Sequence, residues 1–170
     1  MTSDVSVIVI TGNMGAGKTT ILAEASDLLT GAGIVHAAID LDTLGDMPDE
    51  SWSDLPYRNL SCVWENCAAA GASRVMIAEA LESDRELDRI QQAVPGAQIV
   101  VARLSATRET LRRRVARREL PVLRGAFVAR VDELQLLIDR AQLEFTLASD
   151  DGRSVTDIAR DLLSRAQWLP

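Results

Sequence analysis

The chain has 170 residues, with 25 acidic against 18 basic side chains and a formal net charge of −7. With 47% hydrophobic and 25% charged residues, its composition is that of a globular protein and not of a disordered or collagen-like chain. The acidic balance argues against a protein that coats duplex nucleic acid, so nucleic acid is not an expected partner. The length predicts a single well-cored domain over residues 1–170.

The apolar runs and the cysteines exclude two further classes. The longest apolar runs, such as Val7 to Ile10, are far shorter than the ~18 residues that span a bilayer. No basic segment followed by an apolar core opens the sequence, so we expect no membrane partner and a cytoplasmic location. Cys62 and Cys67 are five apart and His36 is the only histidine, which predicts packing thiols and no Cys/His metal cluster.

Short apolar runs alternate with amphipathic stretches along the whole chain, a pattern typical of βαβ units around a parallel sheet. The expected strands cover residues 5–11, 34–40, 74–79, 98–104 and 145–148. The expected helices cover residues 19–29, 59–70, 84–94, 107–120, 127–144 and 155–166, and a polar loop covers 41–57. The sequence thus predicts an α/β, three-layer fold with a five-stranded parallel sheet.

A phosphate-binding motif follows the first expected strand. The run GNMGAGKT fits G-x-x-x-x-G-K-[ST] and precedes an amphipathic helix, as this motif requires. Backbone N–H groups of such a loop form an anion nest, the lysine reaches the β and γ phosphates, and the hydroxyl ligates Mg²⁺. We therefore expect ATP and Mg²⁺ as cofactors. The expected nucleotide-binding residues are Gly12, Asn13, Met14, Gly15, Ala16, Gly17, Lys18, Thr19 and Thr20.

Absent motifs narrow the class of P-loop protein. Lys18 is the only lysine, so the Asn-Lys-x-Asp motif that reads guanine cannot occur elsewhere in the chain. The sequence has no transporter-type signature loop and no Asp-Glu pair after an apolar strand. These absences favour a small kinase over a GTPase switch, a motor or a transport ATPase.

Three carboxylates follow expected strands. Asp40 and Asp42 come after the second strand, at the sheet edge where the phosphate loop lies, and Glu79 ends the third. One aspartate is expected to hold Mg²⁺ through water, and the other to orient or deprotonate an acceptor hydroxyl. The alternative is that an aspartate caps a turn. Glu79 is a further candidate on the metal side.

Eight arginines lie between residues 103 and 124. Arg114 and Arg118 share one helix face, as do Arg113 and Arg117, and one pair is expected to face nucleotide from a helical lid at about 112–126. The alternative is a solvated basic face. Arg58 is the one cation near the acidic loop 43–57, so it is a candidate substrate contact.

Together these residues resemble small P-loop kinases, with adenylylsulfate kinase, shikimate kinase and chloramphenicol phosphotransferase as the nearest likenesses. The resemblance implies that Asp40 is the magnesium-side acid and Asp42 the substrate-side acid or base. It also implies that Arg114 stacks on adenine, that Arg118 contacts phosphate from the lid, and that residues 149–154 border the adenine. The acceptor is not implied, because Met14 replaces a usual serine and the substrate motifs of the two metabolic kinases are missing.

The sequence thus predicts an ATP-dependent phosphotransferase acting on a hydroxyl of a small metabolite or natural product. Lys18, Asp42 and Arg118 are the expected catalytic residues, with Asp42 and Arg58 on the substrate side and Thr19, Asp40 and Glu79 on the metal side. One alternative is a regulatory P-loop ATPase without a small-molecule acceptor. Another is a nucleotide or 5′-polynucleotide kinase, which the acidic first hundred residues disfavour. Homodimer formation is left open.

Overall fold

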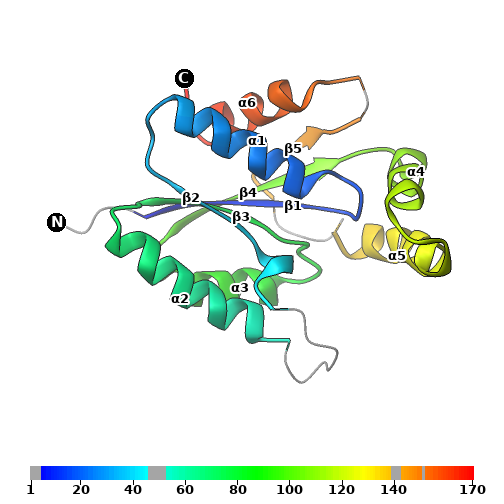
Figure 1. Ribbon diagram of the computed structural model, residues 1–170, viewed down its shortest axis with the longest axis horizontal. Helices are drawn as coiled ribbons and strands as arrows, with labels where there is room; N and C mark the ends of the chain where they lie inside the picture. Colours follow the sequence, from blue (N-terminus) through cyan, green and yellow to red (C-terminus); the bar gives the residue numbers. More distant parts are fainter. Residues whose placement is uncertain (1–4, 46–52, 139–142, 151) are drawn as a thin grey trace.

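Five parallel strands form the centre of the molecule. The computed structural model describes residues 5–45, 53–138, 143–150 and 152–170. Its strands are β1 (Ser6–Gly12), β2 (Ala37–Asp40), β3 (Arg74–Ala78), β4 (Gln98–Ser105) and β5 (Phe145–Ala148). They lie in the order β2-β3-β1-β4-β5, and every adjacent pair is parallel. The predicted α/β fold with a five-stranded parallel sheet is confirmed (Figure 1).

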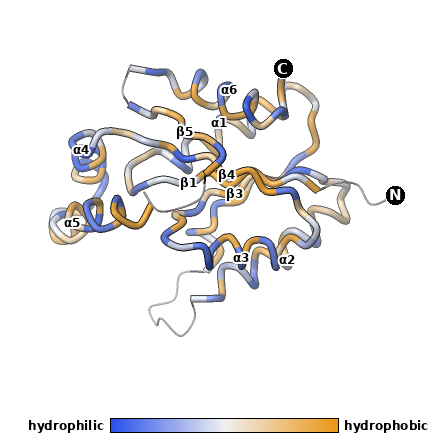
Figure 2. The backbone as a smooth tube through the Cα atoms, turned by 180° about the vertical axis from the view of Figure 1, so that it is seen from behind, coloured by the Kyte–Doolittle hydropathy of each residue, from blue (hydrophilic) through white to orange (hydrophobic). Residues whose placement is uncertain are grey.

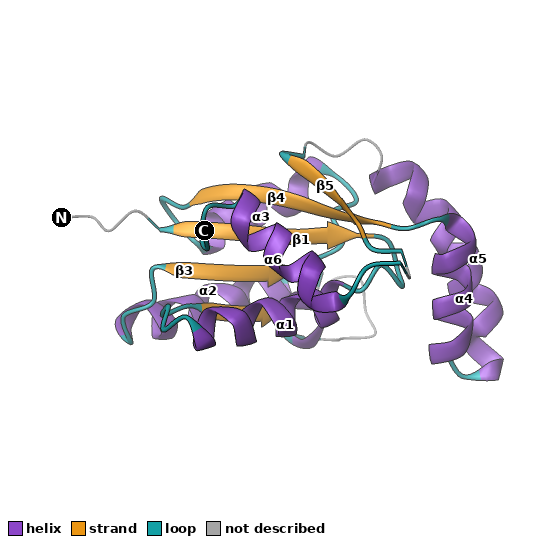
Figure 3. Cartoon of the chain, turned by 90° about the horizontal axis from the view of Figure 1, so that it is seen from above, coloured by secondary structure: helices purple, strands orange, loops and turns teal. Residues whose placement is uncertain are grey.

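Helices cover both faces of this sheet. One face carries α1 (Lys18–Gly31) and α6 (Val155–Arg165), and the other carries α2 (Leu55–Ala69) and α3 (Asp84–Ala93) (Figure 1). The remaining two helices, α4 (Arg108–Arg118) and α5 (Pro121–Ile138), pack together beyond the carboxyl ends of the strands (Figure 3). The expected lid segment, about 112–126, therefore corresponds to most of α4, the link after it and nearly the first two turns of α5.

The central strand divides the core in two. Ile8 and Ile10 of β1 pack toward α1 and α6, whereas Val7 and Val9 pack toward α2 and α3, because successive side chains of a strand point to opposite faces. All four are fully buried. Figure 2 shows the hydrophobic residues concentrated in these inner strands. Such near-continuous apolar strands are typical of a parallel sheet covered on both faces.

Several boundaries differ from the predicted ones, chiefly at prolines. The helix predicted from residue 59 begins at Leu55, with Pro56 in its first turn, and the one predicted from 127 begins at Pro121 and runs through Gly125. Proline in the first turn of a helix removes an N–H that has no helical partner there, so it starts a helix as readily as it ends one. Residues 143 and 144 are not helical, contrary to the prediction, and 139–142 lie outside the described residues.

The other structural expectations are met in part. His36 precedes β2 instead of lying within it, and its ring nitrogens contact the Ser26 hydroxyl and the Ile34 carbonyl, both at 2.8 Å. Trp64 is buried in the core, but Cys62 is exposed, so the prediction that both thiols pack inside is wrong. In the described part of the chain, no helix is long and apolar enough to cross a membrane.

Candidate active site

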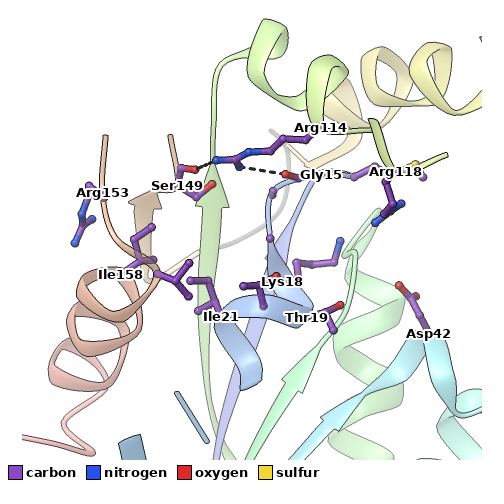
Figure 4. A pocket seen from close by; sticks show the side chains of 15 residues that line it. Gly15, Lys18, Thr19, Ile21, Asp42, Arg114, Arg118, Ser149, Arg153 and Ile158 are labelled. Carbon is purple, nitrogen blue, oxygen red and sulfur yellow. Dashed lines mark hydrogen bonds between the residues drawn. The ribbon is translucent and has the colours of Figure 1, made fainter. Parts of the chain in front are cut away.

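The phosphate loop joins β1 to α1 and lines a cavity of about 430 Å³ at the carboxyl edge of the sheet (Figure 4). Lys18 is the first residue of α1, and its Nζ donates a hydrogen bond of 3.1 Å to the Gly12 carbonyl oxygen. Burial lowers the pKa of the Lys18 ammonium, and the carboxylates of Asp42, Glu79 and Asp40 offset part of that effect. Seven of the nine predicted loop residues, from Met14 to Thr20, line the cavity.

Asn13 has a different task from its neighbours in the loop. Its buried side chain donates from Nδ2 to the Val131 carbonyl at 2.8 Å and to Gln135 Oε1 at 3.1 Å, both on α5. Its Oδ1 accepts from the Met14 N–H at 2.7 Å. The side chain of Asn13 therefore fastens the phosphate loop to α5 and does not line the cavity.

Replacing either of two glycines in the phosphate loop by alanine should destabilise the protein, but to different extents. The two variants therefore form a matched pair. Gly12 (φ 147°) would place a Cβ 2.6 Å from the Leu104 carbonyl oxygen, whereas Gly17 (φ 95°) would place one in open space. We expect Gly12→Ala to lose about 3 kcal/mol of stability, from backbone strain plus overpacking, and Gly17→Ala about 1 to 2 kcal/mol from strain alone. Thermal denaturation of both variants tests this, and equal losses would contradict it.

Asp40 lies beside the predicted metal-binding hydroxyl. Thr19 Oγ1 donates to Asp40 Oδ2 at 2.6 Å, and Asp40 Oδ1 accepts from the Asp42 N–H at 3.2 Å. Asp40 thus both caps the short 3₁₀ turn Leu41–Thr43 and faces Thr19, so the capping role and the metal-side role are compatible. Among the described residues no three His, Cys, Asp or Glu side chains form a metal-binding group. The hydroxyl of Thr19 and the carboxylate of Asp40 offer two oxygen ligands of the kind Mg²⁺ prefers, and its other oxygens would come from nucleotide and water.

A second cavity, also about 430 Å³, lies next to the first. Asp42 lines both cavities. The second is further lined by Tyr57 of α2, by Glu79 at the end of β3, and by residues of α3 and the turn before it. The Tyr57 hydroxyl donates to Glu79 Oε1 at 3.1 Å. Asp42 therefore lies between the two cavities. There it can contact both a group bound at the phosphate loop and a group bound in the second cavity.

Among the described carboxyl groups, Glu79 is the one whose pKa is clearly raised. Burial, and then the nearby Asp42 carboxylate, raise the pKa of Glu79 from an ordinary 4.5 to about 7. Burial also raises the pKa of the Tyr57 hydroxyl, helped by Glu79. Near neutral pH the second cavity thus contains a carboxyl group poised between its two protonation states.

The raised pKa of Glu79 predicts how stability depends on pH. Between about pH 4.5 and 7 the folded protein retains a proton on Glu79 that the unfolded chain has released, so stability falls as the pH rises through this window. Glu79→Gln removes that dependence, and its stability relative to wild type should rise with pH by up to about 3 kcal/mol. Denaturant titrations at several pH values measure this. A Glu65→Gln control, at an exposed position of α2, should follow wild type, and a parallel curve for Glu79→Gln would refute the expectation.

The arginines of α4 divide between the cavity and the α4–α5 contact. Arg114 donates from Nη1 to the Gly15 carbonyl at 3.2 Å and from Nη2 to the Ser149 carbonyl at 2.7 Å, joining the phosphate loop to the segment after β5 (Figure 4). Arg118 lines the cavity as well (Figure 4), and its guanidinium pairs with the Glu119 carboxylate at 2.7 Å. Arg113 and Arg117, the alternative pair, do not line it.

Arg58 lies apart from these groups. It is exposed on α2 and lines a third cavity, between α2 and α3, that does not include Asp42. Sequence reasoning missed Glu82, Glu86 and Arg89, which line the second cavity. Glu82 follows β3 at the sheet edge where Asp40 lies, but Glu86 and Arg89 lie on α3, and no local pattern links them to that edge. Ser149 and Arg153, from the segment 149–154 that the resemblance places beside the adenine, line the first cavity.

Comparison with known proteins supports the fold. No protein-family model matches the sequence, and no curated protein matches it either. A sugar kinase from Janibacter sp. HTCC2649 is 17% identical, with a TM-score of 0.68 over 98% of this chain and 96% of that one. Shikimate kinase from Bacteroides thetaiotaomicron is 20% identical, with a TM-score of 0.62 over 95% and 98%. APS kinase from Mycobacterium tuberculosis, solved with AMPPNP and APS, is 19% identical, with a TM-score of 0.63 over 95% and 98%.

These similarities define the class of fold. The chain has the α/β P-loop fold of small-molecule kinases, and two of the three families that its sequence resembles, shikimate kinase and adenylylsulfate (APS) kinase, are among the matching structures. The resemblance expected from the sequence is confirmed at this level. Fold likeness at such low identity does not determine a substrate.

Proposed function

We propose that the protein is an ATP- and Mg²⁺-dependent phosphotransferase that transfers the γ-phosphoryl group to a hydroxyl of a small metabolite or natural product. The observation that carries this proposal is the position of Asp42, which lines both the phosphate-loop cavity and the cavity beside it. A transferase needs two sites that share the reacting atoms. A regulatory nucleotide-binding protein has no need of the second.

On the nucleotide side, each residue has a distinct task. The loop N–H groups and Lys18 bind the phosphates, and Thr19 with Asp40 holds Mg²⁺. When bound, Mg²⁺ neutralises charge on the β and γ phosphates. Arg114 braces the phosphate loop against Ser149, so the base would lie near this brace, beside the apolar side chains of α6.

On the acceptor side, Asp42 orients the hydroxyl and accepts its proton, while Arg118 stabilises charge on the transferring phosphoryl group. We assign Glu79 to the acceptor and not to the metal, because it lines only the second cavity and contacts Tyr57 there. Arg58 lines neither cavity that Asp42 borders, so we assign it no contact with the acceptor. Movement of α4 and the start of α5 as a lid would exclude water during transfer.

Label transfer tests this function. Purified protein is incubated with γ-labelled ATP, Mg²⁺ and a panel of hydroxylated metabolites and natural products, and the label is followed by chromatography. The proposal predicts a labelled acceptor ester whose formation needs Lys18. Tight ATP binding without a labelled acceptor across the panel would contradict it and favour the regulatory alternative, and labelled nucleotide or polynucleotide would favour a nucleic-acid kinase.

A further inference from the structure

Acidic side chains outnumber basic ones in the cavity beside Asp42. Four carboxylates line it against one arginine; they belong to Asp42, Glu79, Glu82 and Glu86, and the arginine is Arg89. Asp42 lies in the turn after β2, Glu79 and Glu82 lie in the link between β3 and α3, and Glu86 lies in the first turn of α3. The fold thus brings the turn after β2 and the segment after β3 to one small volume with the same sign of charge.

Little of this charge is neutralised from within the cavity. Arg89 is engaged by Asp54, with an Nη2 to Oδ1 distance of 2.7 Å, and its guanidinium lies 5.2 Å from the Tyr57 ring centre. Arg130 of α5 pairs with Glu82 at 2.8 Å, from a residue that does not line the cavity. Arg130 thus neutralises Glu82 from outside the cavity, whereas Arg89, the one arginine of the lining, is paired with Asp54.

In the described part of the chain no cation is hydrogen-bonded to the other three acids, although Lys18 acts electrostatically on Asp42 and Glu79 from the neighbouring cavity. Glu79 accepts from the neutral Tyr57 hydroxyl at 3.1 Å. Glu86 Oε2 accepts from the Ser83 N–H at 2.7 Å and from the Ser83 hydroxyl at 2.9 Å, as the start of α3 requires. Glu86 also helps to raise the pKa of Glu79, so the two carboxylates act on one another. Partly buried acids that repel each other are stabilised by a positive charge placed between them.

Resting on the proposed function, we infer that the acceptor is a hydroxylated amine, bound with its ammonium group between Glu79 and Glu86 and its hydroxyl at Asp42. An anionic acceptor would face four carboxylates, and a neutral one would add no positive charge to that of Lys18, which acts on Asp42 and Glu79, and of Arg130, which pairs with Glu82. An ammonium group supplies both the missing charge and donors for the carboxylate oxygens.

The chemical step balances with these groups. The acceptor oxygen forms a bond to the γ-phosphorus while the bond from that phosphorus to the β–γ bridging oxygen breaks, and Asp42 takes the hydroxyl proton. The products are ADP and a phosphate ester. The amine remains protonated and is not itself phosphorylated, because an ammonium nitrogen has no lone pair with which to attack.

Acceptor sets matched in shape but not in charge test the inference. The probes are glucosamine, glucose and glucuronate, with 2-deoxystreptamine, myo-inositol and quinate as a second set, each assayed with γ-labelled ATP. The expected result is that kcat/KM for the amine exceeds that for its neutral counterpart by about tenfold or more, with no transfer to the acid. Transfer that favours a neutral or anionic member overturns the inference but leaves the kinase function standing. No transfer to any member, despite ATP binding, overturns both.

A single charge change separates electrostatics from shape. Glu86→Gln removes one negative charge, yet glutamine can still accept from Ser83 and keep the start of α3 intact. It should raise KM for the accepted amine by about tenfold, with kcat nearly unchanged and with no effect on the neutral counterpart. Glu65→Gln, which removes one charge at an exposed position of α2, is the control and should leave KM unchanged. An unchanged KM in Glu86→Gln, or equal changes for amine and neutral compound, would rule the ammonium site out.

Discussion

Lys18→Ala is expected to reduce kcat/KM for ATP by about 10³-fold while the protein remains folded. Lys18 is held at the first position of α1, with its Nζ 3.1 Å from the Gly12 carbonyl, so its ammonium sits inside the phosphate loop. Alanine is a good helix former, so the start of α1 tolerates it. Steady-state kinetics measure the loss, and circular dichroism with thermal denaturation verifies the fold.

Lys18→Arg is the matched control because it keeps the charge. A planar guanidinium is longer and cannot sit as a compact point charge above Gly12, so we expect activity between those of the alanine variant and wild type. Wild-type activity in Lys18→Ala would exclude Lys18 from phosphate binding and with it the assignment of the loop.

Asp42→Asn is expected to reduce kcat for transfer by about 10²- to 10⁴-fold, with KM for ATP nearly unchanged. Asparagine has the same shape but cannot accept the hydroxyl proton, and the capping bond within the 3₁₀ turn uses the Asp42 backbone N–H, not its side chain. The measurement is kcat and KM for both substrates, once an acceptor is known, with ATP affinity measured separately.

Asp40→Asn tests which of the two aspartates acts on the metal side, a question that the sequence left open. Asp40 bonds Thr19 at 2.6 Å, so this variant should raise the Mg²⁺ concentration needed for half-maximal activity more than it lowers kcat at saturating Mg²⁺. If the two variants exchange these behaviours, the assignments of Asp40 and Asp42 must be reversed. Full activity in Asp42→Asn would remove that residue from the mechanism.

Local sequence patterns were sufficient for the strands and the phosphate loop. A run such as Val7 to Ile10, apolar at every position, fits only a strand buried on both faces, and the glycine-rich run after it specifies the loop. The start of α5 was predicted too late because Pro121 and Gly125 read as a break in the local sequence. Packing of α5 against α4 and the Asn13 bonds to Val131 and Gln135 hold this helix in place.

The candidate site was only half predictable, for a physical reason. Residues next to the motif, such as Thr19 and Asp40, follow from strand order at one sheet edge. The brace from Arg114 to Ser149 depends on contacts 35 positions apart in the sequence, and the resemblance suggested stacking on adenine for this arginine instead. Glu82 and Glu86 carry no motif, and only the folded chain shows that they meet Asp42 around one cavity.

The most direct test of the account is the ratio of ADP formed to phosphorylated acceptor formed, measured in one reaction with Mg²⁺ and ATP. Because Asp42 borders both cavities, transfer should pass from one to the other without release of free phosphate. The account predicts a ratio of about one to one. ADP accompanied only by inorganic phosphate, at the same rate with and without acceptor, would contradict it.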